Sequence, residues 1–291
     1  MKVTGFTFIR NAIKFDYPVV EAIKSILPLC DNFVVAVGNS EDGTRELISS
    51  INPEKIKIID TIWDDSLREG GKVLAVETDK AFAAIDEDTD WCFYIQGDEV
   101  VHEQYHAAIK AGMEKWKDDK SVDGLLFKYL HFYGSYDYVG DSSSWYNNEI
   151  RIIRKNPKIY SYKDAQGFRK NEDEKLTVAP IDAFVYHYGW VKEPEAMQKK
   201  QEDFNKLWHD DEWVNKNVKA AEQFDYESHI NALQKFTGTH PEVMEERIKS
   251  KNWQFDYDLS FNKFTLKQRV KNFLQNKLGY NLSYRNYILK K

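Results

Sequence analysis

Cysteine is scarce in this sequence, and the marks of secretion and membrane insertion are missing. The 291 residues include two cysteines, Cys30 and Cys92, each inside an apolar stretch. We therefore expect two buried thiols and no disulfide framework. No apolar run approaches the ~20 residues that a membrane-spanning helix needs. The first residues also lack the charged and apolar segments of a secretory signal, so we expect a cytoplasmic protein.

Other absences narrow the function. The sequence contains neither a Gly-x-Ser-x-Gly elbow nor a His-Glu-x-x-His zinc motif, which argues against the common hydrolase classes. The net charge is −6 and basic residues gather only near the C-terminus, so no nucleic-acid partner is expected. The apolar content of 42% and charged content of 30% are those of a globular protein. The length suits one large α/β domain with an appendage, or two modest domains.

The first hundred residues show a regular alternation of strands and helices. Apolar runs predict strands at 3–9, 33–37, 55–59 and 91–95, and helical spacing predicts helices at 18–27, 44–51 and 72–85. Short apolar strands that alternate with helices are typical of a parallel sheet buried on both faces. Such sheets bind ligands beyond the carboxyl ends of their strands, so the polar residues that follow each strand are the candidate site.

The second half predicts a mixed sheet followed by helices. A helix is expected at 103–116, strands at 124–132, 150–153 and 184–188, and a loop at 134–148. From 194 to about 248 the pattern is helical and highly charged. We divide the chain into a catalytic α/β domain, 1–192, and a helical C-terminal region, 193–291. This region would pack on the first domain or contact an acceptor or membrane surface.

The C-terminal stretch from 259 onward contains no acidic residue. Leu266, Val270, Phe273, Leu274 and Leu278 recur there at helical spacing among lysines and arginines, which predicts a basic amphipathic extension. Residues 262–291 could thus lie on an anionic membrane surface. Alternatively, the apolar face docks on the protein body and the basic side chains are solvated.

The strongest local feature is the segment WCFYIQGDE at residues 91–99. An apolar strand stops at a small residue that two carboxylates follow, and carboxylates at a strand end suit Mg²⁺ or Mn²⁺. Gly97 would let the backbone come close to a ligand. The alternative is a solvated turn in which Asp98 and Glu99 cap the helix expected near Glu103.

Two segments together resemble the family 2 glycosyltransferases. One is VAVGNSEDGTRE at residues 35–46, and the other is QGDE at 96–99, in the place of that family's Asp-x-Asp motif. The resemblance covers 1 to about 105, and more loosely 145–154 and 185–190. It implies a GT-A-like (Rossmann-like), mostly parallel sheet flanked by helices, and a nucleoside diphosphate sugar as the donor. It further implies metal-assisted transfer with inversion to a hydroxyl of a glycan or lipid-linked glycan.

The same resemblance assigns roles to residues at the strand ends. The donor would be bound by residues that follow the first, second and fourth strands: Phe8, Ile9, Arg10, Asn11, Gly38, Asn39, Gln96 and Gly97. Asp98 would reach a divalent metal between the two phosphates, which would neutralise the charge on the departing nucleoside diphosphate. Gln96 replaces the usual first Asp of the metal motif, so Asp98 is the one clear carboxylate ligand.

Three further side chains are candidates. His187 would complete the metal site, because imidazole accepts Mn²⁺ readily; the alternative is a histidine buried among aromatic residues. An inverting transfer needs a carboxylate base on the acceptor side. Of Asp141, Glu149 and Asp164 we select Glu149, which leads from a loop into a strand. Its alternative is an ion pair with Arg151 or Arg154.

Lys72 and Arg68 precede a predicted helix. They could steady the diphosphate at its N-terminus, or the Gly70-Gly71 segment between them could be a mobile loop.

Two other functions stay open. A sugar nucleotidyltransferase has a similar sheet and metal, but it normally carries a glycine-rich phosphate loop, and the segment FIRNAI at 8–13 has no glycine. A non-catalytic protein that binds a nucleotide sugar or a glycan is the second alternative. The replacement at Gln96 keeps that alternative open.

Overall fold

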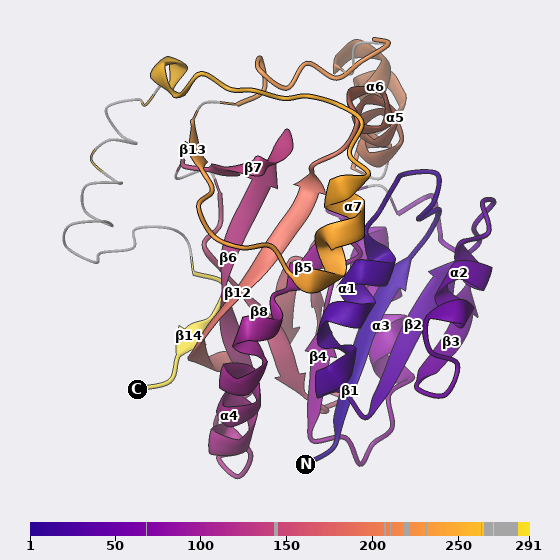
Figure 1. Ribbon diagram of the computed structural model, residues 1–291. Coiled ribbons are helices and arrows are strands. Elements are labelled where there is room, and N and C mark those ends of the chain that lie inside the picture. The colour runs from indigo at the N-terminus through magenta and orange to yellow at the C-terminus, as the bar shows by residue number, and fades with distance from the viewer. Residues whose placement is uncertain are drawn as a thin grey trace.

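The computed structural model describes residues 1–67, 69–142, 145–206, 208–209, 211–217, 221–230, 232–262, 264, 270 and 285–291. Within these residues, eleven strands join in one sheet and helices cover both of its faces (Figure 1). The predicted α/β class, with a sheet flanked by helices, is confirmed.

The N-terminal hundred residues build the parallel part of the sheet. Its strands are β1 (Val3–Ile9), β2 (Asn32–Gly38), β3 (Ile56–Thr61) and β4 (Trp91–Tyr94), in the order β3-β2-β1-β4. All three pairings are parallel. The connecting helices are α1 (Val19–Ile26), α2 (Thr44–Ile51) and α3 (Lys72–Ala83). All seven elements were predicted, and their bounds differ from the predicted ones by at most a few residues.

Helices cover the two faces of this parallel part unequally. Val19 and Ile23 of α1 pack with Val35 of β2 in one core cluster, which also takes in α2. Val73 of α3 packs with Phe6 of β1 in a second cluster on the opposite face (Figure 1). Because the strands are buried on both sides, they read as continuous apolar runs without alternation. Because these four strands run parallel to one another, their carboxyl ends meet at one edge of the sheet.

The second half of the chain adds mostly antiparallel strands. They are β5 (Glu99–Val101), β6 (Gly124–Tyr133), β7 (Ser135–Gly140), β8 (Asn148–Arg154) and β12 (Thr177–Trp190). β8 pairs antiparallel with both β4 and β6, which joins the two parts of the sheet. β12 runs parallel to β6 and antiparallel to β5. The helix expected at 103–116 is present as a 3-10 turn (Glu103–Tyr105) followed by α4 (His106–Trp116).

The loop predicted at 134–148 is wrong over its first half. β7 occupies 135–140 and pairs with β6, with Val139 opposite Phe132. Tyr136 and Val139 are buried in an aromatic cluster with Phe132. Packing against neighbouring aromatic residues thus overrides a composition rich in Gly, Ser and Asp.

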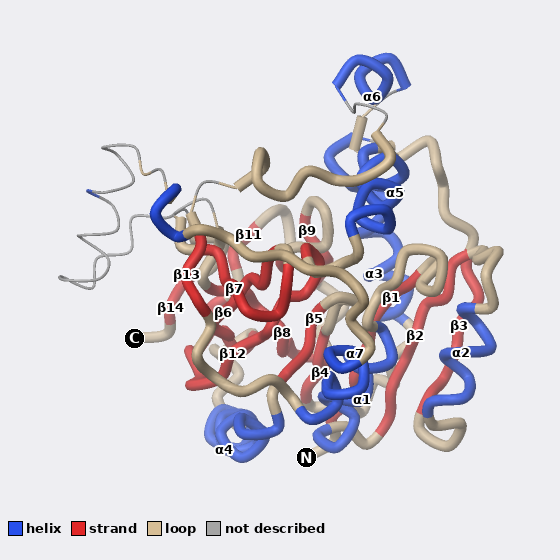
Figure 2. The backbone as a smooth tube through the Cα atoms, turned by 45° about the horizontal axis from the view of Figure 1, so that its top comes forward, coloured by secondary structure: helices blue, strands red, loops and turns tan. Residues whose placement is uncertain are grey.

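A small second sheet was not predicted. It consists of β9 (Ile159–Tyr162), β10 (Gly167–Lys170) and β11 (Glu174–Lys175), in the order β11-β10-β9 (Figure 2). In the turn between β9 and β10, Lys163 and Ala165 have left-handed φ values of 55° and 63°. This turn carries Asp164 toward the carboxyl ends of the parallel strands.

Between 194 and 248, the residues that the structure describes are less helical than predicted. The region from 193 onward contains α5 (Pro194–Asn205), α6 (Asp211–Asn217) and α7 (Glu245–Lys249), with α5 and α6 beyond the upper ends of β1 and β12 in Figure 1. It also contributes β13 (Leu233–Lys235), which pairs with β7, and β14 (Ile288–Leu289), which pairs with β12. Single 3-10 turns complete the described elements: Leu27–Leu29, Glu69–Gly71, Glu242–Met244 and Leu259–Phe261.

Most of the predicted basic helix within 262–291 lies outside the described residues, so its membrane contact stays a prediction. The structure describes the end of this segment as β14 and its flanks, attached to the edge of the sheet beside β12. In the described part of the chain, no helix is long and apolar enough to cross a membrane.

A buried ion pair connects β5 to β8. Arg151 of β8 donates to both carboxylate oxygens of Glu99 of β5, from Nη2 at 2.7 Å and from Nε at 2.8 Å. Both side chains are fully buried. The Tyr129 hydroxyl of β6 also donates to Glu99 at 2.7 Å, and Arg151 Nη1 donates to Gln166 O, beside β10, at 3.0 Å. Four elements therefore converge on one carboxylate–guanidinium pair.

Replacement of Arg151 by Met should lower the free energy of unfolding by about 3–5 kcal/mol, because it leaves the Glu99 charge buried without its partner. Urea unfolding measures the change. The control is Lys128→Met, because the Lys128–Asp182 pair at 2.7 Å is exposed and should contribute about 1 kcal/mol or less. Equal losses in the two variants would contradict a central role for the buried pair.

Candidate active site

A cavity of about 770 Å³ lies beyond the carboxyl ends of the parallel strands. Nine of the twelve residues singled out from the sequence line it: Phe8, Ile9, Arg10, Asn11, Asn39, Gln96, Gly97, Asp98 and His187. The other three, Gly38, Lys72 and Glu149, do not. The cavity is at the edge where a parallel sheet is expected to bind ligands.

The turn after β2 shapes the loop after β1. Thr44 Oγ1 accepts a hydrogen bond from Ala12 N at 2.8 Å, and Asp42 Oδ2 accepts one from Lys14 N at 2.7 Å. Asn11, at the start of this loop, has a left-handed φ of 53°. Part of the motif that carries the family resemblance therefore acts indirectly, because it holds residues 11–14 in place along the cavity.

Trp63, which follows β3, forms an aromatic wall of the cavity. The Arg10 guanidinium lies 4.4 Å from the centre of its ring and also pairs with Asp65 at 2.9 Å. Gly38 makes room for the indole, because a Cβ at this position would lie 2.4 Å from Trp63 Nε1. The missing side chain of Gly38 thus leaves the space that the Trp63 indole occupies. The Trp63–Arg10 stack offers a surface for a flat ring.

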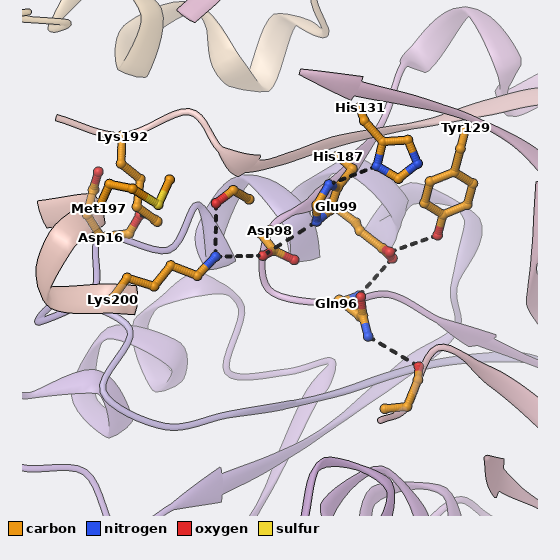
Figure 3. Close-up of polar contacts among 12 residues, drawn as sticks. Asp16, Gln96, Asp98, Glu99, Tyr129, His131, His187, Lys192, Met197 and Lys200 are labelled. Atoms are coloured by element: carbon orange, nitrogen blue, oxygen red, sulfur yellow. Dashed lines mark hydrogen bonds and ion pairs between the residues drawn. The ribbon is translucent and has the colours of Figure 1, made fainter. Parts of the chain in front are cut away.

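Asp98 lies between a lysine and a histidine (Figure 3). Its Oδ2 is 3.4 Å from Lys200 Nζ of α5 and 3.7 Å from His187 Nε2 of β12. Burial by itself would raise the pKa of Asp98, but its interactions with His187 and Lys200 outweigh burial and hold the pKa well below its usual range. Asp98 is therefore an ionised carboxylate that faces the cavity.

The two neighbouring acids of the Gln-Gly-Asp-Glu segment have separate roles. Asp98 faces the cavity, whereas Glu99 points into the sheet and binds Arg151. Neither caps the following helical turn, because His102 Nδ1 accepts the hydrogen bond from Gln104 N at 3.3 Å. The helix-cap alternative for these acids is therefore wrong.

The close approach of Asp98 and His187 depends on Gly189. A Cβ at this position would lie 2.6 Å from Asp98 Oδ2 and 2.7 Å from His187 Nε2, so any larger residue would push the two apart. The backbone reinforces the contact, since Tyr188 N donates to Asp98 O at 2.8 Å.

His131 determines which nitrogen of His187 carries a proton. Its Nε2 is 2.8 Å from Tyr146 O, which can only accept, so this nitrogen is protonated. Burial, and then the charge of His187, lower the pKa of His131 to about 3. His131 is therefore neutral, and its Nδ1 accepts a hydrogen bond from His187 Nδ1 at 3.2 Å. When His187 is also neutral, its Nε2 lone pair faces Asp98.

Asp98 and His187 form a partial ligand set for a divalent metal. Among the residues that the structure describes, no group of three or more His, Cys, Asp and Glu side chains is placed to hold an ion. Gln96 is held elsewhere, because its Nε2 donates to Tyr94 OH at 3.3 Å and to Ala165 O at 3.2 Å. Mg²⁺ often takes one or two protein ligands and completes its shell with water and substrate phosphates. The carboxylate and the imidazole lone pair fit a metal that is bound together with a phosphate ligand.

The unpredicted β9–β10 turn brings Asp164 into the cavity wall. The neighbouring Ala165 O accepts the hydrogen bond from Gln96, so Asp164 lies on the turn that meets the end of β4. Burial raises the pKa of Asp164, although backbone hydrogen bonds oppose the shift. Asp164 is thus a carboxylate of the cavity with increased basicity.

Glu149, the base chosen from the sequence, is buried in β8 and does not line the cavity. Neither arginine proposed as its ion-pair partner is one: Arg151 pairs with Glu99, and Arg154 Nε donates to Val122 O at 3.1 Å. Glu149 Oε2 has no hydrogen-bond partner among the described residues. Burial, only partly offset by Arg151, raises the pKa of Glu149 to about 8.

The predicted phosphate-binding pair before α3 is not in the site. Lys72 begins α3 with an exposed side chain and does not line the cavity. Arg68 lies outside the described residues.

The most informative residue that sequence reasoning missed is Lys200. It lies in the helical segment PEAMQKKQEDFN at 194–205, where nothing distinguishes it from Lys199. Lys192, just before this helix, is fully buried and donates from Nζ to Asp16 O. Burial, and then the nearby Lys200 charge, lower the pKa of Lys192 to about 7.

Several solved structures are similar to this chain. No protein-family profile matches the sequence, and no curated protein matches it. The structure of S. aureus TarS 1-349 in complex with UDP aligns with 13% identity and a TM-score of 0.40, covering 76% of this chain and 68% of that one. A longer S. aureus TarS structure aligns with 12% identity and a TM-score of 0.38, covering 69% of this chain and 38% of that one.

Two further solved structures align with lower TM-scores. Glucosyl-3-phosphoglycerate synthase from Mycobacterium tuberculosis, in complex with Mn²⁺, UDP and phosphoglyceric acid, aligns with 17% identity and a TM-score of 0.29 over 45% of this chain and 43% of that one. A 4-diphosphocytidyl-2C-methyl-D-erythritol synthase from Anaerococcus prevotii aligns with 10% identity and a TM-score of 0.37 over 66% and 89%. Similarity at this level does not establish an activity.

Replacement of Glu149 by Gln should remove a pH dependence of stability. The folded protein keeps a proton on Glu149 up to about pH 8, whereas the unfolded chain releases it above the ordinary value of 4.5. Stability therefore falls as the pH rises through this window and then becomes level. Between pH 5.5 and pH 8 the wild type should lose on the order of 3 kcal/mol more than Glu149→Gln.

Urea unfolding at the two pH values measures this difference. The exposed Glu54→Gln variant is the matched control and should follow the wild type. Parallel pH profiles for the wild type and Glu149→Gln would show that Glu149 ionises normally in the folded protein.

Proposed function

We propose that the protein is a glycosyltransferase that moves a sugar from a nucleoside diphosphate sugar to a hydroxyl group of a glycan or lipid-linked glycan, with inversion. The observation that carries this proposal is the position of ionised Asp98 between His187 and Lys200, at the carboxyl ends of parallel strands. A site with these charges, in a cavity of about 770 Å³, suits a diphosphate flanked by a base and a sugar.

The two sides of the cavity suit the two ends of such a donor. The Trp63–Arg10 stack and the amide of Asn39 offer aromatic and polar contacts for a nucleotide base and ribose. The diphosphate would then extend toward Asp98 and Lys200. A divalent metal held by Asp98 and His187 would supply positive charge to the oxygens of the departing nucleoside diphosphate.

The acceptor hydroxyl must lose its proton as it attacks the sugar, and Asp164 is placed for this step. It lines the cavity, and burial raises its pKa, which makes it a better proton acceptor than an exposed carboxylate. Glu149 is the second candidate, because it was selected from the sequence and burial raises its pKa as well. It would need a rearrangement of the cavity wall to reach a substrate.

A nucleotidyltransferase is disfavoured by the backbone of the loop after β1. Phosphate loops bind their ligand through free backbone N–H groups. Here the N–H groups of Asn11, Ala12 and Lys14 are used by Ser40, Thr44 and Asp42, respectively. This loop therefore has few N–H groups left for a triphosphate.

Thermal unfolding with nucleoside diphosphates tests the donor site. UDP, GDP, CDP, ADP and TDP are each added with Mn²⁺ or with EDTA. One nucleotide at a hundredfold its Kd should stabilise the fold by about 2.7 kcal/mol. The part of the shift that depends on Mn²⁺ should disappear in Asp98→Asn. If none of the five raises the melting temperature, the proposed donor class is wrong.

Turnover of the donor identified in this way separates the two candidate bases. Asp164→Asn should lower kcat by about a hundredfold or more and leave the Kd of the nucleotide unchanged, because a general base acts on the acceptor. Glu149→Gln should stay within a few-fold of the wild type. The reverse pattern would assign the base to Glu149. Absence of turnover with any acceptor hydroxyl, despite nucleotide binding, would favour the binding-protein alternative.

A further inference from the structure

Lys200 is a cation held at the centre of the site (Figure 3). Its Nζ donates to Gly189 O at 2.9 Å and lies 3.4 Å from Asp98 Oδ2. The side chain is buried and passes over the Tyr17 ring, with Nζ 5.0 Å from the ring centre. Unlike Lys199, it reaches the cavity from α5.

The ammonium group retains bonding capacity in this position. It has three N–H donors, and the described residues give it two acceptors, Gly189 O and Asp98. The second contact is long for a charge-assisted hydrogen bond. Lys200 is thus hydrogen-bonded firmly to a backbone carbonyl and only weakly to the carboxylate. An anion in the cavity can therefore replace Asp98 as its partner.

The same carboxylate oxygen faces both Lys200 and His187. A divalent cation that used Asp98 Oδ2 and the His187 Nε2 lone pair would occupy the region next to the ammonium. A metal ion and an ammonium group beside the same carboxylate oxygen repel each other strongly where water is excluded. The metal and the ammonium therefore compete for Asp98, unless an anion binds between them.

The charges around Lys200 favour such an anion. Lys192, fully buried nearby, adds a second amino group whose partner is the Asp16 carbonyl oxygen, not a carboxylate. Asp203, three residues after Lys200 on the same helix, is engaged by Lys206 at 2.9 Å and by Lys14 at 3.4 Å. When a metal takes Asp98, the two buried lysines are left with excess positive charge.

We propose that Lys200 is a phosphate ligand that pairs with Asp98 until a phosphate group binds in the cavity. In the ligand-free protein its ammonium neutralises Asp98. When a divalent cation binds Asp98 and His187, the ammonium turns to the diphosphate that enters with it. The diphosphate is identified through the proposed function, but the anion site itself is defined by Lys200, Gly189 and Asp98. It can be tested with inorganic pyrophosphate and a divalent cation, without any nucleotide.

The proposal predicts changes of opposite sign in one variant. In Lys200→Met, Mn²⁺ added alone should bind about tenfold more tightly, because its competitor at Asp98 is gone. Pyrophosphate titrated into the protein at saturating Mg²⁺ should bind about tenfold more weakly, because a charge-assisted hydrogen bond is lost. Electron paramagnetic resonance of free Mn²⁺ measures the first affinity and titration calorimetry the second. Lys200→Arg should restore much of the pyrophosphate binding.

Lys206→Met is the matched control. It removes the same charge from the same helix at the rim of the cavity, and its ammonium contacts Asp203, not Asp98. Both affinities should stay within about threefold of the wild type, as expected for an exposed charge. Thermal unfolding of each variant verifies the fold, and Lys200→Gln replaces Lys200→Met if the latter is not folded.

Three results would overturn the proposal. If both affinities fall together in the Lys200 variants, the residue only supports the structure of the site. If neither changes, or if pyrophosphate does not bind the wild type, Lys200 is not a phosphate ligand. Failure of the proposed function looks different: pyrophosphate would bind in a Lys200-dependent way while no nucleoside diphosphate of the panel stabilises the protein.

Discussion

The buried pair of Glu99 and Arg151 is the contact on which the site depends. Asp98 is the last residue of the turn between β4 and β5, and Glu99 is the first residue of β5. Because Glu99 is fixed inward by Arg151 and Tyr129, Asp98 is turned outward to the cavity. Glu99 also accepts from Gln96 N at 3.1 Å, which closes the turn between the two strands. A pair that looks structural thus orients the functional carboxylate beside it.

The parallel half of the fold could be predicted because its information is local. β1 to β4 are continuous apolar runs, and the helices between them carry apolar residues at regular spacing, so composition and period suffice. The rule that ligands bind at strand ends then selects nine of the residues that line the cavity. β7, β9 and β10 could not be found from local pattern, because they take their stability from side chains distant in sequence, as Tyr136 and Phe168 show.

Lys200, which was missed, and Asp164, which was named as a possible base but not selected, share a reason. Lys200 and Lys199 are identical in type and adjacent in a charged helix, and only the packing of α5 on Tyr17 decides which one enters the site. Asp164 lies on a turn with left-handed backbone at both neighbours, Lys163 and Ala165, and neither is a glycine that would signal it. In contrast, Gly38 was selected as a donor-binding residue, but it does not line the cavity and instead makes room for Trp63.

The charge balance of the site favours an anionic ligand over a neutral one. Two ammonium groups, Lys192 and Lys200, are buried near a single ionised carboxylate, Asp98. Burial of an ammonium whose partner is only a carbonyl oxygen, as at Lys192, is unfavourable for the fold. Burial lowers the pKa of Lys192 to about 7, which reflects how unfavourable its charged form is at this position. A diphosphate would supply the missing negative charge, so the feature that weakens the empty protein is the one that would stabilise its complex.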